Sequence, residues 1–134
     1  MREILFRGNA NGKWVEGQLG YETTTTPPTP IIVCGEAEWV DGNDWKIPEW
    51  YSVDPSTVGQ YTGITDRKGN RIFEGDVIRF SLKTETTDYV VEWCDGGFVF
   101  RDVKIRAMGG DLVQSDADNA EIVRNIHDNA DLLK

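Results

Sequence analysis

The sequence predicts an all-β protein with at most short helical turns. Runs of β-forming residues recur along its 134 residues at roughly 8–12-residue spacing, and turn signals containing glycine separate them. Residues 57–80 show both features most densely. Lys68-Gly69-Asn70 is a tight turn between two strand-like runs, and Glu74-Gly75-Asp76 is a second break before the alternating strand 77–80. We therefore expect hairpins, and no helix longer than about three turns.

The N-terminal residues predict a hairpin followed by an exposed loop. Residues 2–8 and 13–19 are rich in β-forming residues and flank the turn Asn9-Ala10-Asn11-Gly12. The stretch 23–30 contains threonines and three prolines. Because proline lacks the backbone N–H and fixes φ, we expect an extended surface loop there.

The central segment predicts a second hairpin and a very short helix. Residues 31–34 are predicted to form a short strand. A turn signal at residues 41–44 predicts a hairpin, so we expect the Trp-rich acidic residues 31–53 to form a hairpin extension. Asp54-Pro55 is typical of a helix start, with a capping Asp and Pro at the first helical position. Gly59 ends that helix almost at once.

A third hairpin is expected in the second half of the chain. Residues 89–93 and 97–101 flank the turn Cys94-Asp95-Gly96. Residues 103–106 are expected to continue the sheet, and the polar stretch 108–119 is predicted to be a loop.

Composition predicts one compact domain over residues 1–134, because this length is enough to bury a core. No apolar run approaches the roughly 18 residues of a membrane span, and residues 1–7 lack the apolar stretch of a signal peptide. We therefore expect a cytoplasmic protein without membrane contact. Cys34 and Cys94 are expected to be two buried free thiols in this reducing compartment, with a disulfide as the alternative.

The net charge of −9 is unevenly distributed. Residues 36–60 carry six acids and one base, and residues 111–134 carry six acids and two bases. Residues 61–110 balance eight acids with eight bases. Binding to a nucleic-acid backbone needs clustered Lys and Arg, so this pattern argues against such binding and favours simple solubility.

Six segments stand out in order along the chain, namely residues 2–8, 14–17, 53–55, 58–63, 72–76 and 125–129. In these segments the chain resembles the YopX-like proteins of bacteriophages and prophages. The resemblance implies a small SH3-like barrel with its core in 57–106, and a phage or prophage origin in a bacterial host. It implies no catalytic residue, because none is established for the family.

The C-terminal residues allow two interpretations. Ile122, Ile126, Ala130 and Leu133 fall at helical spacing, which favours one amphipathic helix. YopX-like proteins end instead with a strand-like run and a short motif similar to residues 129–133. We predict a strand followed by one helical turn.

No residue pattern points to catalysis, a cofactor or a metal. His127 is the only histidine, so a nucleophilic triad would have to use it, and we interpret it as structural or surface. The two cysteines lie 60 positions apart, without the paired spacing of a zinc site. Gly75 between Glu74 and Asp76 favours a turn in which Asp76 binds backbone amides, not a catalytic carboxylate pair. We predict no enzymatic activity.

The remaining signal is a candidate interaction patch in the acidic segment. Trp and Tyr within a polar rim are common interface anchors, and here they are Trp39, Trp45, Trp50 and Tyr51. Core filling is the alternative explanation for these residues. We predict a phage- or prophage-encoded accessory protein that acts as a non-enzymatic protein-interaction module. Its partner would be a host or phage protein, or a second copy in a homo-oligomer.

The alternative function is related to nucleic acids. In one version of this function, basic and aromatic residues of 61–106 share a face and bind single-stranded nucleic acid weakly. In the other version, the protein binds no nucleic acid, and its acidic surface mimics DNA and competes for the DNA-binding site of a host protein. Direct binding is disfavoured because 61–110 has no excess of positive charge.

Overall fold

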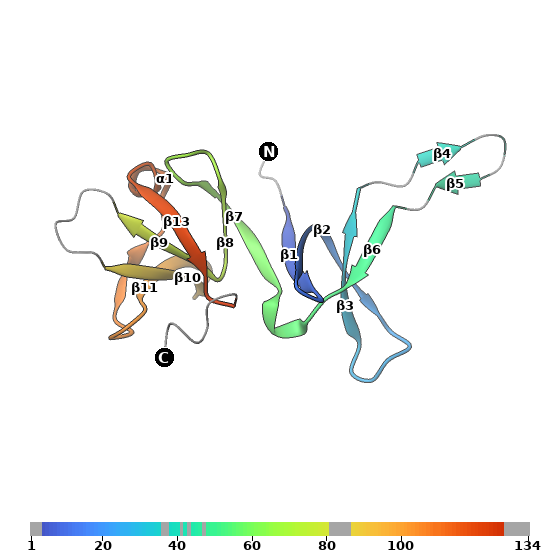
Figure 1. Cartoon of the computed structure of the whole chain (residues 1–134), viewed down its shortest axis with the longest axis horizontal. Helices are drawn as coiled ribbons and strands as arrows, with labels where there is room; N and C mark the ends of the chain where they lie inside the picture. Colours follow the sequence, from blue (N-terminus) through green and yellow to red (C-terminus); the bar gives the residue numbers. More distant parts are fainter. Residues whose placement is uncertain are drawn as a thin grey trace. The chain divides into compact units, whose positions relative to one another are not determined.

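The computed structural model of the chain consists of two compact units of β-strands (Figure 1). It describes residues 4–35, 38–40, 42, 44–46, 48–80 and 87–127. The first unit ends at Gln60 and the second begins at Tyr61. The length of the chain predicts one domain over 1–134. The buried apolar side chains instead gather in two separate clusters, so each unit packs around its own core.

The first unit is an antiparallel sheet with the strand order β6-β3-β2-β1. Its strands are β1 (Phe6–Ala10), β2 (Lys13–Glu22), β3 (Thr29–Cys34) and β6 (Glu49–Ser52). Asn11 and Gly12, with φ of 53° and 90°, make the turn between β1 and β2 that the sequence predicts. Val15, Ile32 and Val53 form the core of this unit.

Two small elements complete the first unit. β4 (Glu38–Val40) and β5 (Asp44–Lys46) pair with each other in the hairpin predicted around 41–44, although residues 41 and 43 lie outside the described residues. The one-turn helix η1 (Pro55–Thr57) starts after Asp54, whose carboxylate accepts a hydrogen bond from the backbone N–H of Ser56 at 3.0 Å. The helix start predicted from Asp54-Pro55 is confirmed.

β7 (Gly59–Thr65) runs through both units. Its first two residues pair with β1, and Tyr61 pairs with Phe73 of β8 (Arg71–Phe73). The second unit also contains a five-stranded antiparallel sheet in the order β12-β11-β10-β9-β13. These strands are β9 (Asp76–Phe80), β10 (Asp88–Cys94), β11 (Gly97–Asp102), β12 (Met108–Asp111) and β13 (Ala120–Asn125), and the short helix α1 (Gln114–Ala117) precedes β13.

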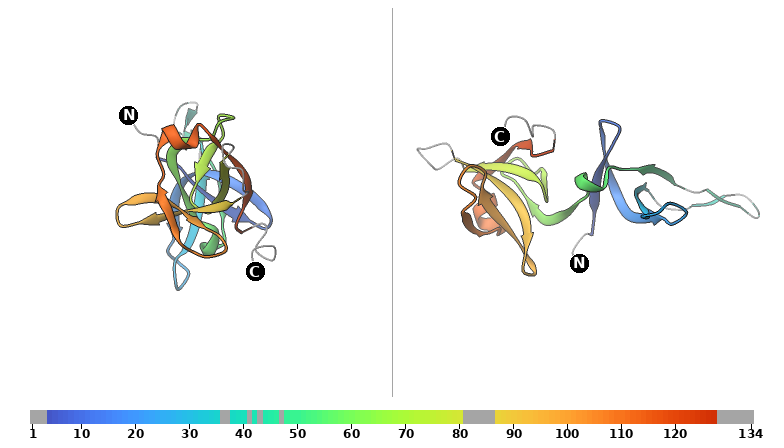
Figure 2. Two further views of the ribbon diagram at one scale, coloured as in Figure 1. Left: turned by 90° about the vertical axis from the view of Figure 1, so that its left-hand side faces the viewer. Right: turned by 90° about the horizontal axis from the view of Figure 1, so that it is seen from below.

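The core of the second unit lies between this curved sheet and the β7–β8 hairpin (Figure 2). Ile72 of β8, Ile78 of β9 and Val91 of β10 are fully buried in it. Three rings meet edge to face at centroid distances of 5.2 to 5.7 Å, and they belong to Phe80, Tyr89 and Phe100. The all-β prediction with short helical turns is confirmed. The packing is barrel-like but open, since β12 and β13 are the outer strands of the described sheet.

The predicted loop and hairpin extension are both shorter than expected. Residues 23–28 are exposed, but Thr29 and Pro30 already belong to β3, and Pro30 is buried. Pro30 has no N–H to donate, yet its carbonyl accepts a hydrogen bond from the N–H of Val53 at 3.1 Å. Residues at both ends of 31–53 are part of the sheet, with Ile32 opposite Tyr51. Among the described residues of this segment, only the β4–β5 hairpin extends beyond the sheet.

The prediction that residues 103–106 continue the sheet is wrong. The Asp102 carboxylate accepts hydrogen bonds from the backbone N–H groups of Lys104 and Ile105 at 2.8 and 3.1 Å, and Arg106 has a φ of 63°. This local capping makes a turn. The strand comes later, as β12, inside the stretch 108–119 that was expected to be a loop.

The core of the second unit also extends past the predicted 57–106. Three of its buried members come from later in the chain, and these are Leu112, Ala117 and Ala120. The strand prediction at the C-terminus is confirmed by β13, so the single-helix alternative is wrong. The predicted turn at 129–133 lies outside the described residues.

The sequence predicts that Cys34 and Cys94 are buried free thiols. Both are free in the structure, but each is only half-buried.

Candidate functional site

The predicted aromatic patch divides between the β4–β5 hairpin and strand β6 of the first unit. Trp39 in β4 lies opposite Trp45 in β5 in the backbone pairing, while Trp50 and Tyr51 are neighbours in β6. The side chains of Trp39 and Trp45 lie outside what the structure describes. Their place in an interaction patch therefore stays a prediction.

Trp50 and Tyr51 differ in burial, because side chains alternate between the two faces of a strand. Trp50 is 50% exposed, whereas Tyr51 is half-buried and packs against the core cluster of the first unit. The Tyr51 hydroxyl donates a hydrogen bond to Glu49 Oε2 at 2.8 Å, and this bond raises the pKa of Tyr51. Tyr51 therefore contributes to packing, and Trp50 presents its apolar area to solvent.

The strand that carries Trp50 is also the edge of its sheet. Register with β3 places Trp50 opposite Val33, and no other described strand pairs with the outer side of β6. An unpaired strand edge offers N–H and C=O groups to another extended chain. β6 thus combines an open edge with an exposed large aromatic side chain.

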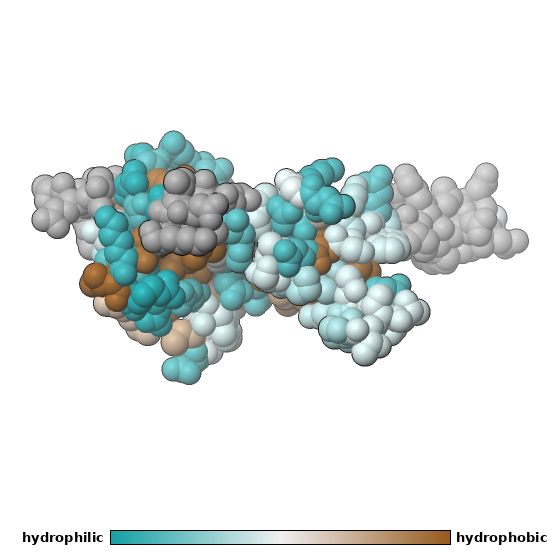
Figure 3. Space-filling view, turned by 60° about the horizontal axis from the view of Figure 1, so that its bottom comes forward, coloured by the Kyte–Doolittle hydropathy of each residue, from teal (hydrophilic) through white to brown (hydrophobic). Residues whose placement is uncertain are grey.

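Exposed apolar side chains also occur in the second unit. Figure 3 shows hydrophobic residues at the surface there, among hydrophilic ones. The large ones are Trp93 (51% exposed), Ile105 (74%), Met108 (51%) and Val113 (43%). Trp93 packs edge to face on Phe98 at a centroid distance of 4.9 Å, so half of its surface is already in contact with its own unit.

Acidic residues of the second unit hold most of its basic residues in ion pairs. At distances of 2.6 to 3.2 Å, the pairs are Glu121 with Arg67 and Lys68, Glu92 with Arg101 and Arg106, and Asp88 with Arg79 and Arg124. Hydrogen bonds from Arg67 and Lys68 lower the pKa of Glu121, the bond from Arg67 most strongly. Cations paired in this way are less free to contact phosphates. The nucleic-acid interpretation of 61–106 gains no support from this arrangement.

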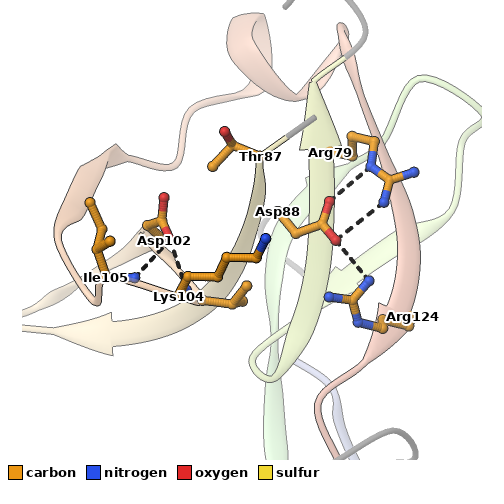
Figure 4. Close-up of a pocket in the computed structure, with 8 residues that line it drawn as sticks. Arg79, Thr87, Asp88, Asp102, Lys104, Ile105 and Arg124 are labelled. Carbon is orange, nitrogen blue, oxygen red and sulfur yellow. Dashed lines mark hydrogen bonds and ion pairs between the residues drawn. The ribbon is translucent and has the colours of Figure 1, made fainter. Parts of the chain in front are cut away.

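A pocket of about 320 Å³ lies beside Asp88 in the second unit (Figure 4). Its walls come from β9, β10, β13 and the turn after β11. Its charged lining residues are Arg79, Asp88, Asp102, Lys104 and Arg124. No sequence pattern predicts this pocket, because the residues that form it are far apart along the chain.

Asp88 holds the two guanidinium groups of this pocket together. Its Oδ1 accepts a hydrogen bond from Arg79 Nε at 2.8 Å, and its Oδ2 accepts from Arg79 Nη2 at 3.2 Å and Arg124 Nη1 at 2.7 Å. Burial acts to raise the pKa of Asp88, but the hydrogen bonds and charges of the two arginines together lower it. Charge-assisted bonds of this kind fix both arginine side chains against the sheet.

We expect Asp88→Asn to reduce the acid sensitivity of the protein. A carboxyl with a lowered folded-state pKa stabilises the fold above its unfolded pKa of about 3.9, and that contribution is lost as the pH falls through the folded value. Urea unfolding between pH 6 and pH 3 should therefore show a smaller loss of stability for Asp88→Asn than for the parent chain. Asp95→Asn, at an exposed turn residue, is the charge-matched control and should follow the parent chain. Equal pH dependence in all three proteins would contradict this assignment.

The residues considered for catalysis take up structural positions. His127 is exposed, and its backbone N–H donates to Asn125 Oδ1 at 2.7 Å. Asp76 is 2% exposed and accepts a hydrogen bond from the backbone N–H of Phe73 at 2.8 Å, as the turn interpretation predicts. Within the described ranges, no group of three or more His, Cys, Asp and Glu residues could hold a metal ion. The absence of catalytic, cofactor and metal sites stays a prediction.

A family model described as YopX protein matches residues 9–134. The chain belongs to the YopX protein family. The crystal structure of protein EF1440 from Enterococcus faecalis resembles this YopX chain with a TM-score of 0.68, over 100% of both chains and at 21% sequence identity. At this identity the likeness shows a shared fold. A search of curated proteins finds no match to the chain.

The YopX motif residues described above form turns and caps. Asp54 caps η1. Asp76 accepts a hydrogen bond from the backbone N–H of Phe73, and Asn125 accepts one from the backbone N–H of His127. Gly75 has a φ of 93°, a conformation that favours glycine. These residues stabilise local turns and caps of this YopX chain. In the part of the chain that is described, no helix has the length and apolar character needed to cross a membrane.

Proposed function

We propose that this YopX chain is a non-enzymatic protein-interaction module, and that β6 with Trp50 is its contact surface. The observation that carries the proposal is a half-exposed tryptophan on an unpaired sheet edge. The resemblance of its motifs to phage and prophage proteins supports an accessory role in the cytoplasm of a bacterial host.

The physical argument rests on what β6 leaves unsatisfied. A tryptophan side chain can bury 150–250 Å², and half of Trp50 remains in contact with water. Strand addition to β6 would satisfy edge N–H and C=O groups and cover this ring in one step. Backbone bonds of this type supply affinity, and the large aromatic side chain supplies a central anchor.

The partner proposed here is a second copy of the chain. An antiparallel pairing of β6 with β6 about a two-fold axis needs only one self-complementary surface, which is the commonest arrangement in homodimers. The charge of −5 on residues 36–60 opposes such a pairing, because like charges meet at a symmetric interface. Salt should therefore strengthen the dimer by screening this repulsion.

Trp50→Ala is expected to weaken self-association by about 30-fold or more, because truncating a central tryptophan anchor typically costs about 2 kcal/mol or more. Sedimentation velocity over a range of protein concentrations measures this change. Circular dichroism of the same variant should remain that of the folded protein, since Trp50 lies outside the core cluster.

Trp93→Ala is the matched control for this experiment. Trp93 is 51% exposed, as Trp50 is 50% exposed, but it lies in β10, an inner strand of the five-stranded sheet. Its substitution should leave the association constant unchanged. If the two variants weakened association equally, the edge of β6 would not be the contact surface.

A further inference from the structure

The pocket beside Asp88 carries more positive than negative charge, against the trend of the whole chain. Arg79, Lys104 and Arg124 contribute three cations, and Asp88 and Asp102 contribute two carboxylates. The pocket lining is therefore at +1 in a protein whose net charge is −9. Arg79 and Arg124 share the single carboxylate of Asp88, and this sharing leaves the lining with one positive charge in excess.

Both carboxylates of the pocket are already engaged. Asp88 accepts hydrogen bonds from both guanidinium groups, and Asp102 accepts from the backbone N–H groups of Lys104 and Ile105 at 2.8 and 3.1 Å. These hydrogen bonds hold the arginines and the turn in place. They fix the positions of the donors around the pocket.

Two donors of the pocket have no acceptor within the described residues. Arg124 donates to Asp88 through Nη1, and its Nη2 has no hydrogen-bond partner there. Lys104 forms no ion pair in the described part of the chain, and Figure 4 shows its side chain reaching toward Asp88. A guanidinium N–H favours an acceptor oxygen, and an ammonium group favours an anion.

We propose that this pocket binds a single carboxylate group, with Lys104 and Arg124 as its donors and Asp88 as a positioning residue. A lining charge of +1 complements a monoanion, whereas a phosphate dianion would bring excess negative charge beside Asp88 and Asp102. The volume of about 320 Å³ is at the low end for ligand pockets, which suits a small group. The carboxylate belongs either to a free small molecule or to an acidic side chain of a peptide.

The test is an NMR titration of the backbone amides of the ¹⁵N-labelled full chain at constant ionic strength. Sodium acetate should give saturable shifts at Lys104 and Ile105, in the turn that lines the pocket. Sodium chloride should not. The amidated peptide Gly-Gly-Glu should give the same shifts if the carboxylate comes from a side chain, with amidated Gly-Gly-Gln as its uncharged control. Shifts with acetate alone would assign the pocket to a free small carboxylate.

Lys104→Gln is expected to weaken acetate binding about tenfold, since it removes one charge-assisted donor. Lys104 is exposed, so this variant should stay folded. Arg124→Lys keeps the charge but removes the guanidinium fork, and it should weaken binding similarly. Equal shifts with chloride and acetate, or unchanged acetate binding in both variants, would overturn the proposal. The pocket lies in the second unit and Trp50 in the first, so this test and the association test succeed or fail separately.

Discussion

Gly17→Ala is expected to destabilise the first unit by about 3 kcal/mol or more. A Cβ atom at Gly17 would lie 2.1 Å from the carbonyl oxygen of Val33 and 2.9 Å from its carbonyl carbon. These are backbone atoms of β3 and cannot rotate away as a side chain would. β2 and β3 would have to separate, which would expose the core around Ile32. Urea unfolding followed by circular dichroism measures the loss.

Gly20→Ala is the matched control in the same strand. A Cβ atom there would meet only the Ile31 side chain at 3.5 Å, an ordinary van der Waals distance. We expect a change within about 0.5 kcal/mol, because the new methyl group fits and alanine restricts the unfolded chain. Similar losses for Gly17→Ala and Gly20→Ala would show that the close approach of β2 to Val33 is not present in solution.

Asp66→Ala is expected to destabilise the second unit by about 2–4 kcal/mol. Asp66 is 4% exposed, and its carboxylate accepts hydrogen bonds from the backbone N–H groups of Lys68 and Asn70 at 2.9 Å and of Ile122 at 3.1 Å. It therefore joins the β7–β8 turn to β13. Its removal would leave three N–H groups without this acceptor.

The predicted loss at Asp66 can be measured by urea unfolding and by amide hydrogen exchange at Lys68, Asn70 and Ile122. All three amides should exchange faster in Asp66→Ala. Asp111→Ala removes the same charge from an exposed position in β12 of the same unit, and it should change stability by no more than about 0.5 kcal/mol. Unchanged exchange at Ile122 would contradict the role of Asp66 in tethering β13.

Elements fixed by local backbone chemistry could be predicted from the sequence. Asn11-Gly12 and Asp95-Gly96 adopt the positive φ values that two-residue hairpin turns require, and both hairpins are present. Asp54 caps its helix through a hydrogen bond two residues away. In each case the deciding interaction lies within a few residues, so the sequence pattern contains it.

Elements that depend on contacts between distant residues could not be predicted. β12 lacks alternating β-forming residues. It fits beside β11 because residue 109 is a glycine, and a Cβ atom at this position would lie only 2.5 Å from the ring of Phe100. The pocket requires Arg124 to reach Asp88, which is 36 residues earlier in the chain. Of the predicted patch, Tyr51 turned out to pack against the core, because only strand register decides which face each residue takes.

The proposal that β6 joins two copies of the chain is tested most directly by light scattering of the unmodified protein. Its mass should exceed that of one chain, 15.1 kDa, and should increase with protein concentration. It should also increase with salt, because screening reduces the repulsion between the acidic segments. A mass of one chain at every protein and salt concentration would contradict the proposal.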